Sequence, residues 1–455
     1  MSGLAESSGT MDKKLKFEFE WEEPGGARGA ELRATWARFR IDIDGQSLTQ
    51  LLDHRTNSVR TSVYLPLYPV AEWIATHWWF LAREFETPEK ASNGYAKRHD
   101  LRFAGEGFAL PSVQFKPLGD YVRIEWKRRV LESQRVEFPA RGEAYIPLDA
   151  FQQALRDLVS AVVERLSEAK ITNSLLHEEW AGLAKLDKEE QDFVSAAAAL
   201  GLDPFATQTK EQDRLLRAAA DVPGSLLTSF LAIASINTLE QQVATLRAAI
   251  AETAKRSTKL YALAHLRSHV ESGSNNGAPW RQGYDYAQRL RKALGIEVQP
   301  LTTFASYCAA LRVHENDLRE AAHDEPSPLF VALVNSNAKG SPGFALGGGL
   351  AREIGRSRRA TFALTRALFE YLSSPVEQPS LVTRAVSDRE KRNRAFAAEF
   401  LAPAEALRAK VSGSVVGEDE MEDMAATFGV SSFVIRHQLF NHGIARSIAA
   451  MDDEE

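Results

Sequence analysis

The 455-residue sequence contains a single cysteine, Cys308, so no disulfide can form within the chain and no metal cluster can be built from cysteines. It has no run of 18 apolar residues free of charge, which argues against a membrane-spanning helix. Residues 1–14 lack the apolar stretch of a signal peptide. From these absences we expect a cytoplasmic protein with no membrane partner.

The charge balance gives little indication of a nucleic-acid binder. The chain has 55 basic and 61 acidic residues, a formal net charge of −6 at pH 7. Hydrophobic residues make up 44% and charged residues 25%, which is typical of globular proteins. The length indicates roughly two to four domains. Frequent alanine and arginine are compatible with a bacterial source.

Residues 13–150 have the texture of a β-rich domain. Lys14–Trp21 and Trp36–Asp44 alternate apolar and polar residues, which predicts half-buried strands. Shorter strands are predicted at Leu101–Phe103, Ser112–Phe115 and Tyr121–Trp126. No chemistry is indicated for this region, so its role stays open.

A tryptophan cluster follows Pro69 within this region. Val70–Phe85 is predicted to be helical and carries Trp73, Trp78 and Trp79. These rings could stack on bases or line a peptide groove. Alternatively, they pack the helix onto the sheet. Aromatic residues at helical spacing usually belong to a core, which favours the second interpretation.

Residues 151–272 are predicted to form a separate helical region. Phe151–Ala169 and Lys188–Leu200 have apolar residues at a spacing of three and four, typical of amphipathic helices. The following residues, Ser272–Gly277, are all small or amide residues. This composition predicts a linker and a domain boundary, with proteolytic cleavage near Asn275.

After this linker the expected elements follow a distinctive order across residues 278–446. Two helices come first, then a hairpin, then the helices Arg358–Glu370 and Asp388–Leu401. The last of these ends in the sequence FAAEFLAP, up to Pro403. Both the order and this motif resemble the ImmA/IrrE-type metallopeptidases. The resemblance implies an α+β, mostly helical chain with a zincin-like C-terminal domain.

The same resemblance implies a zinc site made by two helices. In that family two histidines four residues apart and a later glutamate bind zinc, while a glutamate next to the first histidine activates water. Alignment on Phe362–Leu364 places Arg366 at the first histidine and Ala367 at the catalytic glutamate. It places Glu370 at the second histidine and Glu390 at the third ligand.

These replacements argue against both metal binding and catalysis. Arg366 is permanently cationic and repels a metal ion, while Ala367 has no proton acceptor. We therefore expect no zinc and no other cofactor. Instead, Arg366 is predicted to form ion pairs with Glu370 and Glu390, clamping the two helices together. A metal site with unrecognised ligands stays an alternative.

Two further features bear on nucleic acid. Residues 350–394 contain ten basic and five acidic residues, so this segment could follow a phosphate backbone or could be a solvated face. Met424–Gly443 has the apolar spacing of a helix-turn-helix, with Gly429 at the turn. Few basic residues follow in its second helix, which weighs against DNA binding.

Three functions are therefore open. The first is a non-catalytic regulatory or interaction protein that docks another protein on a degenerate peptidase-like domain. By resemblance, its setting would be bacterial stress response, mobile-element control or phage defence. The second is an active zinc metallopeptidase with an unrecognised ligand set. The third is a DNA-binding transcriptional regulator.

Overall fold

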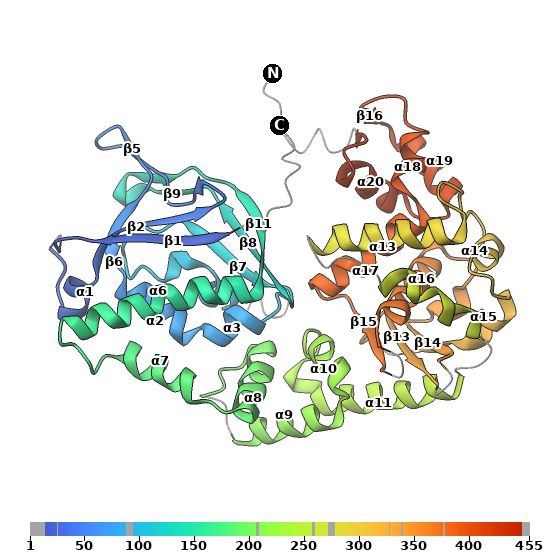
Figure 1. Cartoon of the computed structure of the whole chain (residues 1–455), viewed down its shortest axis with the longest axis horizontal. Helices are drawn as coiled ribbons and strands as arrows, with labels where there is room; N and C mark the ends of the chain where they lie inside the picture. Colours follow the sequence, from blue (N-terminus) through green and yellow to red (C-terminus); the bar gives the residue numbers. More distant parts are fainter. Residues whose placement is uncertain are drawn as a thin grey trace. The chain divides into compact units, whose positions relative to one another are not determined.

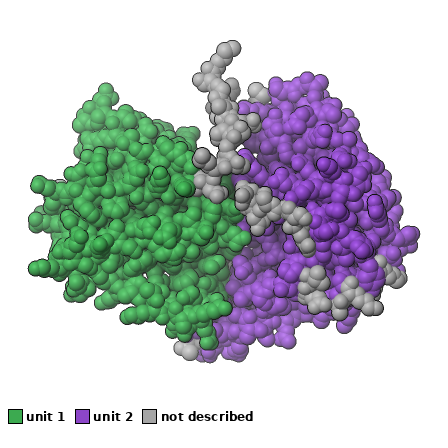
Figure 2. Space-filling view, in the orientation of Figure 1, with its two compact units in different colours: residues 1–208 green, residues 209–455 purple. Residues whose placement is uncertain are grey.

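A computed structural model of the chain has a mixed α+β fold with more helix than strand (Figure 1). The structure describes residues 14–24, 26–87, 94–205, 209–256, 260–271, 278–326, 328–337, 340–375 and 378–447. It divides into two compact units, residues 1–208 and 209–455, which Figure 2 colours separately. The α+β, mostly helical fold class predicted from the sequence is confirmed.

Unit 1 contains three antiparallel sheets in its described part. In the first, β2 (Trp36–Ile43) pairs with β1 (Leu15–Trp21), β3 (Gln46–Ser47) and β6 (Val63–Pro66). The second has the order β5 (Ser58–Arg60), β4 (Leu51–Asp53), β10 (Val136–Phe138), β9 (Arg129–Leu131). The third has the order β11 (Gly142–Pro147), β8 (Tyr121–Lys127), β7 (Ser112–Pro117).

The helices of unit 1 pack against these sheets or, in the case of the last two, against other helices. They are α1 (Ala30–Ala34), α2 (Tyr68–Thr76), α3 (Trp78–Arg83), α5 (Tyr95–His99), α6 (Leu148–Glu168), α7 (Leu175–Lys185) and α8 (Lys188–Ala199), with the 3-10 turns η1 (Leu101–Phe103) and η2 (Glu132–Gln134). The long α6 places Phe151, Leu155 and Leu158 on one buried face. That face contacts β1, β8 and β11, so α6 belongs to the N-terminal core (Figure 1).

Two predicted elements of this region differ from the structure. The predicted strand Leu101–Phe103 is a 3-10 turn, because the Asp100 side chain accepts a hydrogen bond from the Arg102 amide and starts a helical turn. The predicted helix Val70–Phe85 is divided at His77 into α2 and α3. The strands predicted at β1, β2, β7 and β8 are confirmed.

The three tryptophans of α2 and α3 are core residues. Trp73 and Trp78 are buried, and Trp79 is partly buried against the same core. Trp73 Nε1 donates to the Lys97 carbonyl at 3.0 Å, and the Trp78 ring meets Trp180 edge-on at 5.5 Å. These contacts support the core interpretation, because the rings pack against other residues of unit 1.

Unit 2 is built around a four-stranded mixed sheet. Its order is β12 (Ala322–Glu325), β14 (Pro342–Gly347), β13 (Ala332–Ser336), β15 (Ser380–Val382). A small parallel pair, β16 (Val415–Val416) and β17 (Arg446–Ser447), lies near the C-terminus. The predicted hairpin corresponds to β13 and β14, which pair antiparallel.

Helices make up most of the rest of unit 2. They are α9 (Thr209–Asp221), α10 (Gly224–Leu231), α11 (Leu239–Arg256), α12 (Ser268–Glu271), α13 (Pro279–Leu294), α14 (Phe304–Ala310), α15 (Glu315–Ala321), α16 (Arg358–Ser373), α17 (Asp388–Leu401), α18 (Ala404–Arg408), α19 (Glu418–Phe428) and α20 (Ser432–Asn441), with 3-10 turns η3 (Ile236–Thr238), η4 (Tyr261–Leu266) and η5 (Leu350–Glu353). Both α16 and α11 pack on β13 and β14.

The helical region predicted at residues 151–272 is shared between the two units. Helices α6 to α8 belong to unit 1 and α9 to α12 to unit 2, with the division between the units at 208/209. Helix α6 packs on β1, β8 and β11 of unit 1, and α11 packs on β13 and β14 of unit 2, so each helix belongs to the core of its own unit. The predicted linker Ser272–Gly277 lies outside the described residues.

Helix α17 is held in unit 2 by two other helices, α13 and α16. Phe369 on α16 stacks on Phe396 of α17 with ring centroids 4.5 Å apart, and Phe396 stacks on Phe400 at 5.6 Å. On its other side, α17 meets α13 at Gly283. A Cβ atom at Gly283 would lie 2.9 Å from the Ala395 Cβ, so only glycine permits this close approach.

We therefore expect Gly283→Ala to destabilise the protein by about 1–3 kcal/mol, because α13 and α17 must separate to make room for the methyl group. Gly182→Ala is the matched control, since Gly182 is also inside a helix but a Cβ atom added there would meet nothing within 4 Å. This control should be neutral or stabilising by up to about 1 kcal/mol. Urea unfolding measures both changes, and equal stability of the two variants would contradict the packing argument.

Candidate functional site

The interface of α16 and α17 brings together the residues that the sequence singled out. Arg366 and Glu370 are four residues apart on α16, while Glu390 and Asn393 are three apart on α17. Such spacings place both members of each pair on one helix face. All four side chains are buried between the two helices.

Arg366 makes three kinds of hydrogen bond in this interface. Its Nε donates to Asn393 Oδ1 at 2.7 Å, and its Nη2 donates to the Thr383 carbonyl at 2.9 Å. The same Nη2 donates to Glu390 Oε2 in an ion pair. The side chain of Arg366 is 8% exposed and that of Glu390 is 2% exposed, so the pair is buried. The predicted Arg366–Glu390 ion pair is confirmed.

The second carboxylate has a different cation from the one expected. Glu370 forms its ion pair with Arg389, whose Nε lies 2.8 Å from Glu370 Oε2. Asn393 Nδ2 donates to Glu370 Oε1 at 3.2 Å and to Glu390 Oε2 at 3.0 Å. The prediction that Arg366 would also pair with Glu370 is wrong, because Arg389 on α17 takes that position.

The remaining oxygen of Glu390 is also satisfied. Glu390 Oε1 accepts hydrogen bonds from the Thr383 amide and from the Thr383 hydroxyl, the latter at 2.8 Å. Thr383 follows directly after β15, so this contact ties the sheet to the start of α17. Two guanidinium groups therefore face two carboxylates, and the cluster Arg366, Arg389, Glu370 and Glu390 is formally neutral.

Burial and neighbouring charges act in opposite directions on the arginines. Burial lowers the pKa of Arg366, Glu390 opposes this, and the nearby Arg394 lowers it further. Burial alone would lower the pKa of Arg389, but Glu370 raises it overall. A guanidinium ordinarily stays protonated far above neutral pH. Both arginines therefore carry their charge at neutral pH.

The residues at this position do not fit a zinc ion. Arg366 has no lone pair to donate, and the carboxylates are engaged by Arg366, Arg389 and Thr383. Ala367 is fully buried in the apolar core and offers no proton acceptor. Within the described ranges, no three or more histidine, cysteine, aspartate or glutamate side chains group in a way that could hold a metal ion.

Sequence reasoning missed three members of this network. Asn393 could have been found, because it lies three residues after Glu390 on the same helix face. Arg389 is the residue before Glu390, and successive side chains on a helix point about 100° apart. A search for partners on the helix face of Glu390 therefore does not include Arg389. Thr383 lies in the loop between β15 and α17, where no periodicity predicts a contact.

The basic segment 350–394 contains two populations of arginine. One population has carboxylate partners: Arg352 pairs with Asp324 at 2.6 Å, Arg358 with Glu422 at 2.7 Å, and Arg392 with Asp388 at 3.8 Å. The other comprises Arg356, Arg359, Arg384 and Arg394, for which no carboxylate partner is found in the described part of the chain. The segment is therefore neither an evenly solvated face nor a continuous basic stripe.

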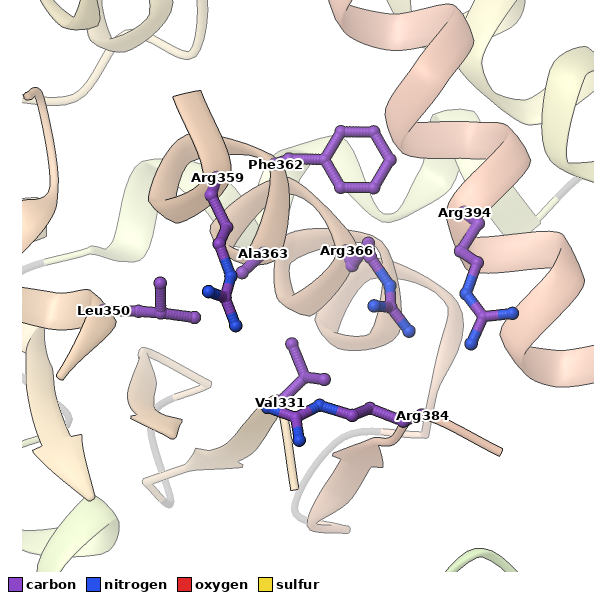
Figure 3. Close-up of a pocket in the computed structure, with 8 residues that line it drawn as sticks. All are labelled: Val331, Leu350, Arg359, Phe362, Ala363, Arg366, Arg384 and Arg394. Carbon is purple, nitrogen blue, oxygen red and sulfur yellow. The ribbon is translucent and has the colours of Figure 1, made fainter. Parts of the chain in front are cut away.

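Arg359, Arg384 and Arg394 line one pocket together with Arg366 (Figure 3). The pocket has a volume of about 290 Å³ and its other lining residues are Val331, Leu350, Phe362 and Ala363. Arg359 and Arg366 come from α16, Arg394 from α17 and Arg384 from the loop before α17. Arg359 and Arg384 are exposed, so the pocket lies at the surface of unit 2.

The C-terminal helices α19 and α20 follow one another across a short turn, and their surface carries few basic side chains, Arg436 and His437 on α20 being exposed. Gly429 turns the chain between them with φ +64°, in the left-handed region. The first turn of α19 carries three acidic residues, and α20 exposes Phe433 and Phe440. Acidic and apolar side chains do not attract a phosphate backbone.

No family model, curated protein or solved structure matches the chain. Over the residues that the structure describes, no helix has the length and apolar character needed to cross a bilayer. The ImmA/IrrE resemblance consequently depends on the FAAEFLAP motif, the order of elements and the position of Glu390, and it stays a prediction.

We expect Arg366→Ala to lower the free energy of unfolding by about 3–5 kcal/mol, because it leaves Glu390 buried without its cation. Glu390→Gln should cost less, since an amide oxygen still accepts from Thr383. Arg352→Ala is the control, because that side chain is 85% exposed and its ion pair with Asp324 should contribute about 1 kcal/mol or less. Thermal unfolding that is unchanged by Arg366→Ala would show that the pair contributes no stability.

Proposed function

We propose that the chain is a non-catalytic regulatory or interaction protein whose C-terminal region is a degenerate ImmA/IrrE-like domain. The observation that carries this proposal is the buried Arg366–Glu390 ion pair. On the alignment that the resemblance implies, Arg366 is at the position of the first zinc ligand and Glu390 is at the position of the third. On this proposal, the Arg366 guanidinium takes the place of the family's metal ion in joining the two helices.

This substitution suits a docking domain better than an enzyme. A zinc site must leave one coordination position open and place a base beside it, and neither is compatible with Arg366 and the buried Ala367. The ion pair and its hydrogen bonds instead fix α16 against α17 without a dissociable metal. The resulting rigid surface would recognise another protein. Its setting, on this proposal, is bacterial stress response, mobile-element control or phage defence in the cytoplasm.

The other two functions have less support. A metallopeptidase with different ligands needs a set of convergent donor groups, and the described residues provide none. A DNA-binding regulator would use α19 and α20, which expose acidic residues in the first turn of α19, Phe433 and Phe440 on α20, and only Arg436 and His437 as basic or titratable groups on α20. The interaction protein is therefore the function that the geometry favours.

Elemental analysis of the purified full-length protein tests the proposal. We expect zinc well below one ion per chain and a melting temperature that EDTA does not change, because no metal contributes to the fold. The variant with Arg366→His, Ala367→Glu and Glu370→His is the positive control, since it restores the family's ligands alongside Glu390.

One tightly held zinc per wild-type chain, together with a lower melting temperature in EDTA, would overturn the proposal in favour of a metallopeptidase. Zinc uptake by the triple variant but not by the wild type would support both the alignment and the loss of the metal site.

A further inference from the structure

Three arginines of unit 2 for which the described residues offer no carboxylate partner line one pocket together with Arg366. Arg359 and Arg366 are seven residues apart on α16, which places them two turns apart on the same helix face. Arg394 reaches the pocket from α17, and Arg384 reaches it from the preceding loop. Figure 3 shows the four guanidinium groups around a common space.

The pocket carries an excess of positive charge that the described chain does not neutralise. Of its four arginines, only Arg366 has a carboxylate partner, Glu390. Arg394 donates to the Ala385 carbonyl at 3.1 Å, which fixes its direction without cancelling its charge. No acidic residue is among the eight that line the pocket. Three uncompensated cations so close together repel one another unless an anion binds between them.

The charge and the size of the pocket indicate the class of anion. A single carboxylate can be bound by one arginine, whereas three or more guanidinium groups match the charge and the several oxygens of a phosphate or diphosphate. The volume of about 290 Å³ is at the small end of ligand pockets. A duplex backbone would need cations spread along a surface rather than gathered in a cavity of this size.

The rest of the lining adds an apolar contact beside the charges. Phe362 is half-buried and lies between Arg359 and Arg366 in sequence, on the same face of α16. Val331 and Leu350 contribute further apolar surface. A phosphate that carries an organic group, such as a nucleoside, would place that group against these side chains.

We propose that this pocket binds a small phosphorylated ligand, with Arg359, Arg384 and Arg394 as the phosphate-binding residues and Arg366 completing the set. The proposal does not depend on the family resemblance or on a non-catalytic function, because it derives from the charges and shape of the pocket alone. A protein that docks partners could use such a ligand as its signal.

Isothermal titration of the full-length protein with pyrophosphate, ADP and adenosine tests the proposal. We expect one saturable site for pyrophosphate and for ADP and none for adenosine, since the arginines recognise phosphate. Arg384→Gln should weaken pyrophosphate binding about tenfold or more, because it removes a charge-assisted contact. The melting temperature should not fall, since Arg384 is exposed and has no ion-pair partner among the described residues.

Arg356→Gln is the matched control, because Arg356 is an exposed arginine of the same basic segment that does not line the pocket. It should bind pyrophosphate like the wild type. Equal weakening by both substitutions would overturn the proposal and indicate diffuse attraction of anions. Absence of saturable pyrophosphate binding would also overturn it. If a short DNA duplex at equal phosphate concentration competes with pyrophosphate for the site, the small-ligand proposal would be overturned in favour of nucleic acid as the ligand.

Discussion

A buried charge must be neutralised where it lies, and this constraint organises the C-terminal unit. Arg366 and Glu390 are both removed from water, so each would be costly without the other. Their contact sets the distance between α16 and α17. Asn393 and Thr383 then use the remaining hydrogen-bonding positions, and the loop after β15 is held by the same carboxylate.

Arg366 links this internal network to the surface of the unit. Its Nε and Nη2 point to Asn393, Thr383 and Glu390, while the side chain also lines the pocket of unpaired arginines. An anion bound there would act on the same guanidinium that clamps the two helices. Ligand binding and the stability of the α16–α17 interface are therefore expected to be coupled.

The sequence predicted long, periodic elements well and short or tertiary features poorly. Asp388–Leu401 is a helix with the predicted bounds, and the alternation of Lys14–Trp21 gives β1. Strands of three residues such as β4 and β15 are too short to show a period. The Arg366–Glu390 pair was predictable from aligned positions, but the partner of Glu370 depended on the packing of α16 and α17. The pocket was not predictable from the sequence, because its arginines come from α16, from α17 and from the loop between β15 and α17.

The most direct test of the account is a double-mutant cycle on Arg366→Met and Glu390→Gln, with stability measured by urea unfolding. If the ion pair holds α16 and α17 together, each single change leaves the other partner buried and uncompensated, and the double variant recovers part of the loss. The account predicts a coupling free energy of about 2 kcal/mol or more. A coupling below about 0.5 kcal/mol would show that the two residues act independently, and that the pair does not replace a metal as the clamp.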